Sequence, residues 1–315
     1  MAFEIPKIRY SGTIKEVTLG TNQRAITVGG ETSYPFYSFE GQMPHSPRIS
    51  FEVWDCMPED WPESVLEPYR DVANDPVAWA KKSIAEYGAE LITLVTRSAD
   101  PNGLDRGAEE VAKAVKAVAD AIDVPLIVWG TSDDDKDAAL LKLVAEVCEG
   151  KNLTIGPLSD KNYKQIGAAA IAYGHRVLAS SPIDVNLAKQ LNILLANLGV
   201  PEDRILIDPT TGGLGYGLEY TYSVMERDRV AALTQEDVKL QNPIVCNLAN
   251  EVWKTKEART SGEEDPKLGD ARTRGVIMES VTAMTLLLAG ADIIVMRHPQ
   301  AIAAVREMIG ELLAP

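Results

Sequence analysis

Short runs of β-branched and other apolar residues recur along the chain and constrain its fold more than any other feature. Eight such runs are separated by segments long enough to form a helix. Their apolar character is continuous rather than alternating, which is typical of parallel strands that helices cover on the outer face. The runs are Ile49–Val53, Leu91–Val95, Pro125–Trp129, Leu153–Ile155, Arg176–Ala179, Ile205–Ile207, Pro243–Val245 and Asp292–Met296.

The segments between these runs carry the signals of helix ends. Asp75 and Pro76 provide an N-cap and a first-turn proline, and Gly88 follows the last turn of the same helix. The segment 182–199 repeats this pattern from a proline to a glycine, and the last helix is expected to begin at Pro299. Strands and helices therefore alternate along the chain.

Eight strand–helix repeats are compatible with a closed barrel or with an open doubly wound sheet. Their even spacing and their number favour closure. A doubly wound sheet would normally carry a glycine-rich turn after its first strand, whereas residues 54–58 read Trp-Asp-Cys-Met-Pro. We therefore predict an α/β fold, a (β/α)8 TIM barrel that spans residues 49–315.

Two regions fall outside the repeat. Residues 1–48 contain the strand-like pieces Thr13–Leu19 and Ala25–Val28, so we expect an N-terminal β-hairpin extension that caps one end of the barrel. The segment 251–269 is long, charged and rich in turn residues. It is either a solvated excursion or a loop that contacts a partner or gates the mouth of the barrel.

Composition excludes several classes of protein. A net charge of −15 would repel a phosphate backbone, so we expect no binding to nucleic acid. No apolar run is long enough to span a bilayer, and we expect a cytoplasmic protein without a membrane segment. The three cysteines are far apart and cannot supply the four ligands of an iron–sulfur cluster; we expect buried, reduced thiols.

The functional face of such a barrel is built from the residues that follow each strand. No run ends in a lysine, as a Schiff-base aldolase would need, and three histidines are too few for a metal-dependent hydrolase. His175 precedes a strand and lies at the wrong end, whereas His298 is either a helix cap or a ligand contact. We predict no catalytic residue set and no metal site on this chain.

The segment Asp208–Gly217 is the most informative of these post-strand positions. Its sequence, Asp-Pro-Thr-Thr-Gly-Gly-Leu-Gly-Tyr-Gly, lets the backbone approach a flat or anionic ligand with exposed N–H donors. It is neither a dinucleotide fingerprint, because Leu218 replaces the third glycine, nor a Walker loop. Asp208 is interpreted as a carboxylate that orders the loop rather than as a general base.

Two other post-strand segments offer polar groups. Ser181 and Pro182 are interpreted as an N-cap and a first-turn proline, while Ser180 is a candidate for the mouth of the barrel. Asn247 and Asn250 offer amide donors and acceptors that suit the amide-decorated edge of a macrocycle or a pterin.

Four of these segments together resemble a specific family. They are Val128–Thr131, Ile155–Leu158, Leu178–Pro182 and Ile207–Gly217. The chain is similar, over nearly its whole length, to the small subunit of the corrinoid iron–sulfur protein, also called the delta subunit of the acetyl-CoA decarbonylase/synthase complex.

The resemblance implies a barrel that pairs with a larger subunit, which carries a four-iron (4Fe-4S) cluster and a corrinoid-binding domain. The corrinoid (cobalamin) would lie between the two subunits. Its cobalt would take a methyl group from methyltetrahydrofolate through a separate methyltransferase and deliver it to CO dehydrogenase/acetyl-CoA synthase. This route is the reductive acetyl-CoA (Wood–Ljungdahl) pathway of anaerobes.

The resemblance also suggests which residues contact the corrinoid or line the mouth. They are Ser180, Thr210, Thr211, Gly212, Gly213, Asn247 and Arg297. A rival interpretation is a pterin-dependent methyltransferase barrel, in which Asp55, Asp208 and Asn247 would bind methyltetrahydrofolate. A third is a scaffold whose mouth is plugged.

Overall fold

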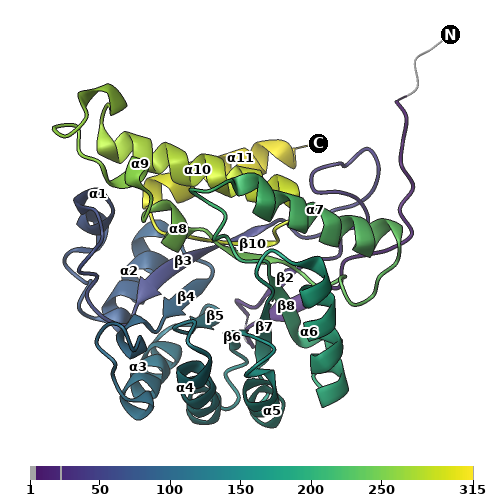
Figure 1. Cartoon of the computed structure of the whole chain (residues 1–315), viewed down its shortest axis with the longest axis horizontal. Coiled ribbons are helices and arrows are strands. Elements are labelled where there is room, and N and C mark those ends of the chain that lie inside the picture. The colour runs from purple at the N-terminus through teal and green to yellow at the C-terminus, as the bar shows by residue number, and fades with distance from the viewer. Residues whose placement is uncertain (1–4, 22, 315) are drawn as a thin grey trace.

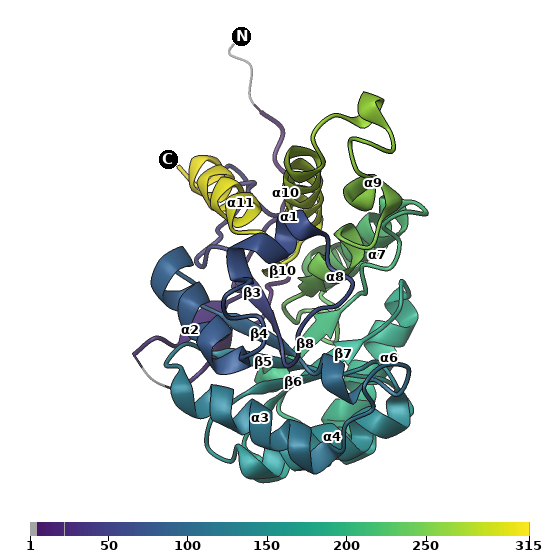
Figure 2. The ribbon, with the colours of Figure 1, turned by 90° about the vertical axis from the view of Figure 1, so that its left-hand side faces the viewer.

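A computed structural model of the chain describes residues 5–21 and 23–314, so residues 1–4 and 22 of the expected extension and residue 315 of the expected barrel lie outside it. Within the described residues, eight parallel strands form one sheet in the order β8-β7-β6-β5-β4-β3-β10-β9. The ring closes between β8 and β9, where Ile207 N donates to Pro243 O at 2.9 Å. The predicted (β/α)8 barrel is confirmed (Figures 1 and 2). Its strands are β3 (Arg48–Trp54), β4 (Ile92–Val95), β5 (Leu126–Trp129), β6 (Thr154–Leu158), β7 (Arg176–Ser180), β8 (Ile205–Asp208), β9 (Val245–Asn247) and β10 (Ile293–Met296).

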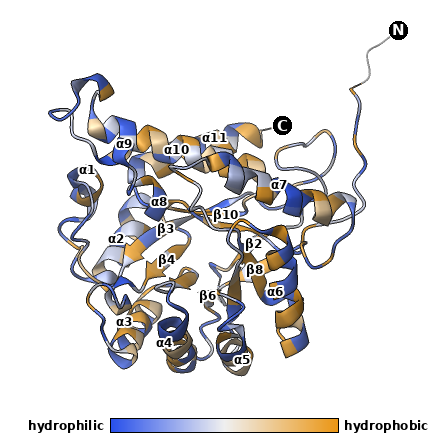
Figure 3. Cartoon of the chain, in the orientation of Figure 1, coloured by the Kyte–Doolittle hydropathy of each residue, from blue (hydrophilic) through white to orange (hydrophobic). Residues whose placement is uncertain are grey.

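Long helices cover the outside of the barrel, and Figure 3 shows that polar (blue) and apolar (orange) residues alternate along them. They are α2 (Pro76–Tyr87), α3 (Ala108–Ala121), α4 (Asp134–Val147), α5 (Tyr163–Tyr173), α6 (Val185–Leu198), α7 (Leu218–Thr234), α10 (Ala271–Ala289) and α11 (Pro299–Leu312). None of the helices in the described ranges has both the length and the hydrophobicity needed to cross a bilayer.

The ends of two helices test the interpretation of capping residues. The Asp75 carboxylate accepts from Val77 N and Ala78 N, and Gly88 ends α2 in the left-handed region, as predicted. The prediction of an N-cap at Ser181 is wrong, because α6 begins at Val185 behind Asp184. The intervening residue Ile183 has a φ of 49° and donates its N–H to Pro209 O, which delays the helix.

The N-terminal hairpin closes the end of the barrel at which the strands begin. It pairs β1 (Val17–Leu19) with β2 (Ile26–Val28) antiparallel, which confirms the predicted extension. Its apolar side chains pack on residues that point into the barrel, so hydrophobic contacts seal this end of the barrel. The barrel residues in this cluster are Leu91, which precedes β4, and the strand residues Ile127, Leu178, Leu206, Val245, Ile293 and Val295.

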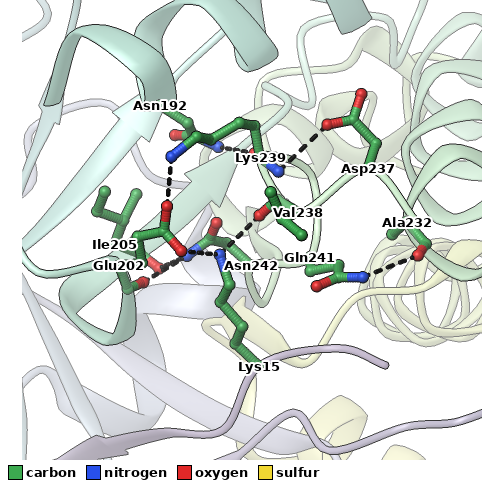
Figure 4. Close-up of polar contacts among 10 residues, drawn as sticks. All are labelled: Lys15, Asn192, Glu202, Ile205, Ala232, Asp237, Val238, Lys239, Gln241 and Asn242. Carbon is green, nitrogen blue, oxygen red and sulfur yellow. Dashed lines mark hydrogen bonds and ion pairs between the residues drawn. The ribbon is translucent and has the colours of Figure 1, made fainter. Parts of the chain in front are cut away.

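Polar contacts fix the segment that leads into the hairpin (Figure 4). The Lys15 ammonium donates to Glu202 Oε2 at 2.8 Å and to Val238 O at 2.6 Å. Lys239 reaches the other oxygen of Glu202, and these charges lower the pKa of Glu202 to about 2. Asn242 Nδ2 donates to Glu202 O and Ile205 O. Hydrogen bonds and ion pairs therefore hold the sealed end of the barrel to the turns before β8 and β9.

The segment 251–269 contacts the start of α10, and its loop after α9 projects at the periphery of the molecule (Figure 2). It contains the short helix α9 (Lys256–Arg259) and a 3-10 turn, Pro266–Leu268. Arg274 holds it by donating to the carbonyl oxygens of Glu257, Thr260, Leu268 and Gly269. Whether it contacts a partner stays a prediction.

Candidate functional site

The open end of the barrel, which we call the mouth, is lined by inward-pointing residues at or directly after the ends of seven strands; β6, whose register with β7 is irregular, is left out. The inward direction follows from alternation: Leu206 and Val245 point into the interior cluster, whereas Ile207 and Cys246 pack against the helices. Residues two places further along the strands must therefore point inward as well. The mouth residues so defined are Trp54, Val95, Trp129, Ser180, Asp208, Asn247 and Arg297.

Asp208 lies at the end of β8, buried, with a hydrogen bond to each carboxylate oxygen. Thr210 N donates to Oδ1 at 2.9 Å, and the Ser180 hydroxyl on the neighbouring strand donates to Oδ2 at 2.9 Å. Burial nonetheless raises the pKa of Asp208 to about 6, because two donors only partly offset the loss of water. The structure thus confirms that Asp208 orders the loop and joins β7 to β8.

The glycine-rich loop after Asp208 is bonded to the neighbouring segments at the mouth end of the barrel. Thr210 has a φ of 59°, a left-handed conformation that non-glycine residues adopt rarely. The buried Thr211 hydroxyl donates to Asn247 O and so ties the loop to the end of β9. Gly213 is confined, because a Cβ there would lie 3.0 Å from Gly217 O, whereas Gly212 is exposed with open space around it.

Asn247 has an unpaired side chain although it is only 6% exposed. Its backbone is held on both sides, by pairing with Val295 of β10 and by the bond from Thr211. Its Oδ1 has no hydrogen-bond partner among the described residues. Other buried side chains of the described residues, such as Asn192 and Asp228, also carry an unpaired oxygen, so the free Oδ1 makes Asn247 available to a ligand or a water molecule without singling it out.

Arg297 follows β10, and its hydrogen-bond donors already have partners within the protein. Its guanidinium donates to both carboxylate oxygens of Glu52, with Nη2 at 3.1 Å from Oε1, and it lies 4.3 Å above the ring of Trp61. The Arg297 N–H donates to Glu279 at 2.6 Å. With 2% exposure, Arg297 braces the mouth from inside; a contact to a ligand stays a prediction.

The remaining candidates make hydrogen bonds within the fold, and whether Asp55 or His298 also contacts a ligand stays a prediction. Asp55 accepts from Ser98 N at 2.8 Å and from the Ser98 hydroxyl. His298 caps α11 by accepting from Gln300 N at 3.1 Å, and His175 accepts from Leu153 N within the fold.

The cysteines were expected to be buried. Cys148 and Cys246 are, whereas Cys56 is half-buried after β3, so the expectation is wrong for Cys56. Among residues 5–21 and 23–314, no three His, Cys, Asp or Glu side chains come together to hold a metal ion.

Sequence reasoning missed Trp129 and Glu52. Trp129 was assigned to a strand and to a segment that carries the resemblance but not to the mouth, where the structure leaves its aromatic ring half-buried. Its position two residues after the inward Ile127 was the available signal. Glu52 is invisible from sequence spacing, because its partner Arg297 lies 245 residues away. The mouth thus combines an aromatic ring, a buried carboxylate and a free amide, which suits binding of a planar polar ligand.

Comparison with known proteins identifies relatives over nearly the full length. The family model described as "CO dehydrogenase/acetyl-CoA synthase delta subunit" matches residues 16–309. The acetyl-CoA decarbonylase/synthase complex subunit delta of Archaeoglobus fulgidus is 38% identical, covering 98% of this chain and 71% of the relative. That of Methanothermobacter thermautotrophicus is 36% identical, covering 97% and 77%.

Solved structures of dihydropteroate synthase share the fold. The Xanthomonas albilineans enzyme in complex with 7,8-dihydropteroate has a TM-score of 0.58 at 14% identity, covering 90% of this chain and all of that one. The Stenotrophomonas maltophilia enzyme has a TM-score of 0.56 at 17% identity, covering 85% and 94%. At these identities the likeness concerns the barrel alone. The sequence matches decide the family: this chain belongs to the delta subunits of the acetyl-CoA decarbonylase/synthase complex.

Proposed function

We propose that this chain is the small subunit of a cytoplasmic corrinoid iron–sulfur protein, in which the barrel mouth covers a corrinoid held mainly by a larger subunit. The cobalt of that corrinoid would carry a methyl group from methyltetrahydrofolate:corrinoid methyltransferase to CO dehydrogenase/acetyl-CoA synthase in the reductive acetyl-CoA pathway. The 4Fe-4S cluster would reside on the larger subunit. Membership of the delta-subunit family over residues 16–309 is the observation that carries this proposal.

The residues of the mouth fit a corrinoid in their chemistry. A corrin ring is flat and carries carboxamide arms, so it requires neutral donors and acceptors rather than a cluster of charges. Asn247 has an unpaired amide, and the side chains of Ser180 and Thr210 are half-buried at the same end of the barrel. The exposed backbone at Gly212 lets a large ring approach without a side chain in between.

In this proposal the protein orients and shields the reacting centre, while the corrinoid supplies the methyl-carrying cobalt. Thr211 and Asp208 hold the loop, and Glu52 holds Arg297, so the mouth is pre-organised before a ligand arrives. A rigid rim loses less conformational entropy on binding than a mobile one would.

The rim also carries apolar surface for the larger subunit. Tyr216, in the glycine-rich loop, is 91% exposed, and Tyr220 in the first turn of α7 is 59% exposed. Exposed tyrosines beside a binding site are typical of interfaces, where they bury large area at small entropic cost. We place the partner on this side of the mouth.

Co-expression with the larger subunit tests the proposal. The expected product is a one-to-one complex that retains a corrinoid, visible in its absorption spectrum under reducing and methylated conditions. A complex of the same stoichiometry without corrinoid, or a chain that stays monomeric beside its folded partner, would contradict the proposal.

A pterin-binding methyltransferase is the second candidate. The carboxylate of Asp208 and the amide of Asn247 favour this candidate, because both offer acceptor oxygens to the N–H-rich edge of a pterin ring. Here the chain alone should bind methyltetrahydrofolate in calorimetry. Binding to the isolated chain at micromolar concentration would support this candidate, and no heat at millimolar concentration would remove it.

A further inference from the structure

The sealed end of the barrel, opposite the mouth, carries two adjoining hollows. The first, which we call the α11 hollow, has a volume of about 480 Å³ and lies between the start of β3 and the end of α11. The second, the hairpin hollow, has about 470 Å³ and lies between β3 and the turn of the N-terminal hairpin. Arg48, Gly88 and Glu90 border both, so the two hollows meet at these residues.

We propose that these hollows form a binding site for an amphipathic carboxylate, meaning a small molecule that carries one carboxylate group on an aliphatic body. The site lies at the other end of the barrel from the mouth. It therefore goes beyond the proposed function and does not depend on it.

The charge of the lining favours an anion. Arg24, Arg48 and Arg306 line the hollows, whereas Glu90 is the only acid among the described lining residues. Asp123 pairs with Arg24 at 3.1 Å, which leaves Arg48 and Arg306 as the principal cations. The chain as a whole has a net charge of −15, so this positive excess is local and attracts an anion to a surface that elsewhere repels it.

Arg48 has hydrogen-bond donors that the protein leaves unused. Its Nη1 donates to Glu90 Oε2 at 3.0 Å, and its Nε is buried without a partner among the described residues. The side chain of Glu90 is 64% exposed and that of Arg48 only 29%, so the carboxylate lies at the outer edge of the pair. Because such an exposed pair contributes little to stability, a ligand carboxylate in the hollow can replace Glu90 at the guanidinium. A guanidinium binds a carboxylate best through two parallel N–H donors.

Arg306 forms a second cationic wall and is held in place by backbone oxygens. It donates to Tyr87 O at 2.8 Å and to Gly88 O at 2.7 Å, and its guanidinium carbon lies 5.4 Å from the centre of the Phe51 ring. Burial lowers the pKa of Arg306, although the charge of Glu90 opposes the effect. Both hydrogen bonds are to neutral carbonyl groups, so a partly desolvated positive charge faces the hollow from a fixed position.

The floor of the α11 hollow is apolar. Ile49 and Ile309 are 6% and 7% exposed, and Leu313 is half-buried beside them. Gly310 keeps the space open, since a Cβ at this position would meet no atom within 4 Å. An aliphatic body placed here is removed from water, which stabilises the complex. A phosphate ion would contact the arginines and leave this apolar surface exposed, so the lining fits a carboxylate with an aliphatic body.

Calorimetric titration of the full chain with octanoate tests the proposal. Two further ligands each carry half of the required chemistry: 1-octanol has the aliphatic body, and inorganic phosphate has the negative charge. We expect octanoate to bind at one site, at least tenfold more tightly than either. Affinity for phosphate or for 1-octanol equal to that for octanoate would overturn the proposal.

Variants of the ion pair give the test a direction. Arg48→Gln should weaken octanoate binding at least tenfold. Its matched control is Arg272→Gln, which removes another exposed pair, with Glu67 at 2.8 Å, and lines neither hollow; it should change the affinity by less than about twofold. Glu90→Gln should strengthen binding about threefold, because it removes the competing carboxylate. A purely structural role of the pair would not produce tighter binding.

A variant of Gly310 tests the cavity itself. Gly310→Leu fills the α11 hollow and leaves both guanidinium groups in place, so it should weaken octanoate binding at least tenfold. It should not lower the melting temperature, because glycine is unfavourable within a helix. The control is Gly107→Leu, at another position where a Cβ meets no atom within 4 Å, and it should bind octanoate like the wild type.

Undiminished octanoate binding by both Arg48→Gln and Gly310→Leu, each shown by circular dichroism to be folded, would disprove the site. That outcome leaves the proposed function untouched, since the proposed function is judged by the corrinoid content of the heterodimer. Conversely, a heterodimer without corrinoid has no bearing on octanoate binding by the full chain.

Discussion

Glu52 and Arg297, which are 245 residues apart in the sequence, form a bidentate ion pair inside the barrel. Both side chains are almost fully buried, at 1% and 3% exposure. Removing one partner from such a pair leaves an uncompensated charge without water, which is more costly than the net gain of forming the pair.

Glu52→Gln should therefore lower the free energy of unfolding in urea by about 3–5 kcal/mol. The control is Glu90→Gln, which removes an exposed carboxylate that pairs with Arg48 and should lower it by less than about 1 kcal/mol. Replacing both Glu52 and Arg297 by apolar residues should recover part of the loss. A Glu52→Gln variant as stable as Glu90→Gln would show that water reaches the pair.

Asp208 should make stability decrease as the pH rises from about 4 to about 6. Its folded pKa of about 6 exceeds the unfolded value of 3.8, so the folded state binds more protons across this interval. Stability from this group is fully present below the unfolded pKa and is lost as the pH rises through the folded one. The full shift corresponds to an upper limit of about 3 kcal/mol.

Asp208→Asn should flatten this pH dependence while keeping an acceptor for Thr210 N. Melting temperatures of both proteins between pH 4 and pH 8 provide the measurement. A wild-type profile with the same slope as that of Asp208→Asn would mean that Asp208 titrates near its ordinary value. Ser180→Ala offers a control, since losing its hydroxyl should raise the pKa of Asp208 further.

Glu31 predicts a pH-sensitive contact at the opposite end of the barrel. Burial, together with the nearby charge of Asp292, raises the pKa of Glu31 well above its usual value, although Arg229 opposes the effect. Ile14 N donates to the backbone oxygen of Glu31 just before β1, which ties the residue to the hairpin, so ionisation of its buried carboxyl group beside Asp292 should weaken the hairpin's attachment. The stability that protonated Glu31 gives to the hairpin should be greatest at low pH and should decrease as the pH rises through the folded pKa of Glu31.

Hydrogen exchange of β1 and β2, corrected for intrinsic rates, should therefore become faster with increasing pH in the wild type and less so in Glu31→Gln. Glu16→Gln, on the exposed side of the same extension, should leave the wild-type trend intact. Equal pH trends for all three proteins would disprove the role of Glu31.

The architecture could be predicted from local sequence because each strand buries both faces and each helix carries its own end signals. The part of the mouth that lies directly at strand ends, such as Asp208 and Asn247, could be predicted in the same way. What depended on distant pairing was not predictable, such as Glu52 with Arg297, or Glu279 accepting from the backbone of Arg297 and His298. The capping error at Ser181 has the same origin, because Pro209 in the next loop redirects Ile183.

Tyr216 should matter for association with the larger subunit and not for the stability of this chain. Its ring is 91% exposed on the glycine-rich loop, so Tyr216→Ala removes few internal contacts and should change the unfolding free energy by less than about 0.5 kcal/mol. A tyrosine at the centre of an interface commonly contributes about 2 kcal/mol or more to binding, so the dissociation constant of the heterodimer should rise about thirtyfold.

A second exposed apolar position makes this prediction discriminating. Ile277, Val281 and Leu288 form an exposed apolar stripe on the solvent-facing side of α10. If the partner sits over the mouth, Ile277→Ala should leave heterodimer affinity unchanged in calorimetry while Tyr216→Ala weakens it. The reverse pattern would place the partner on the outer surface of α10, and the mouth would then have to receive its ligand without a protein lid.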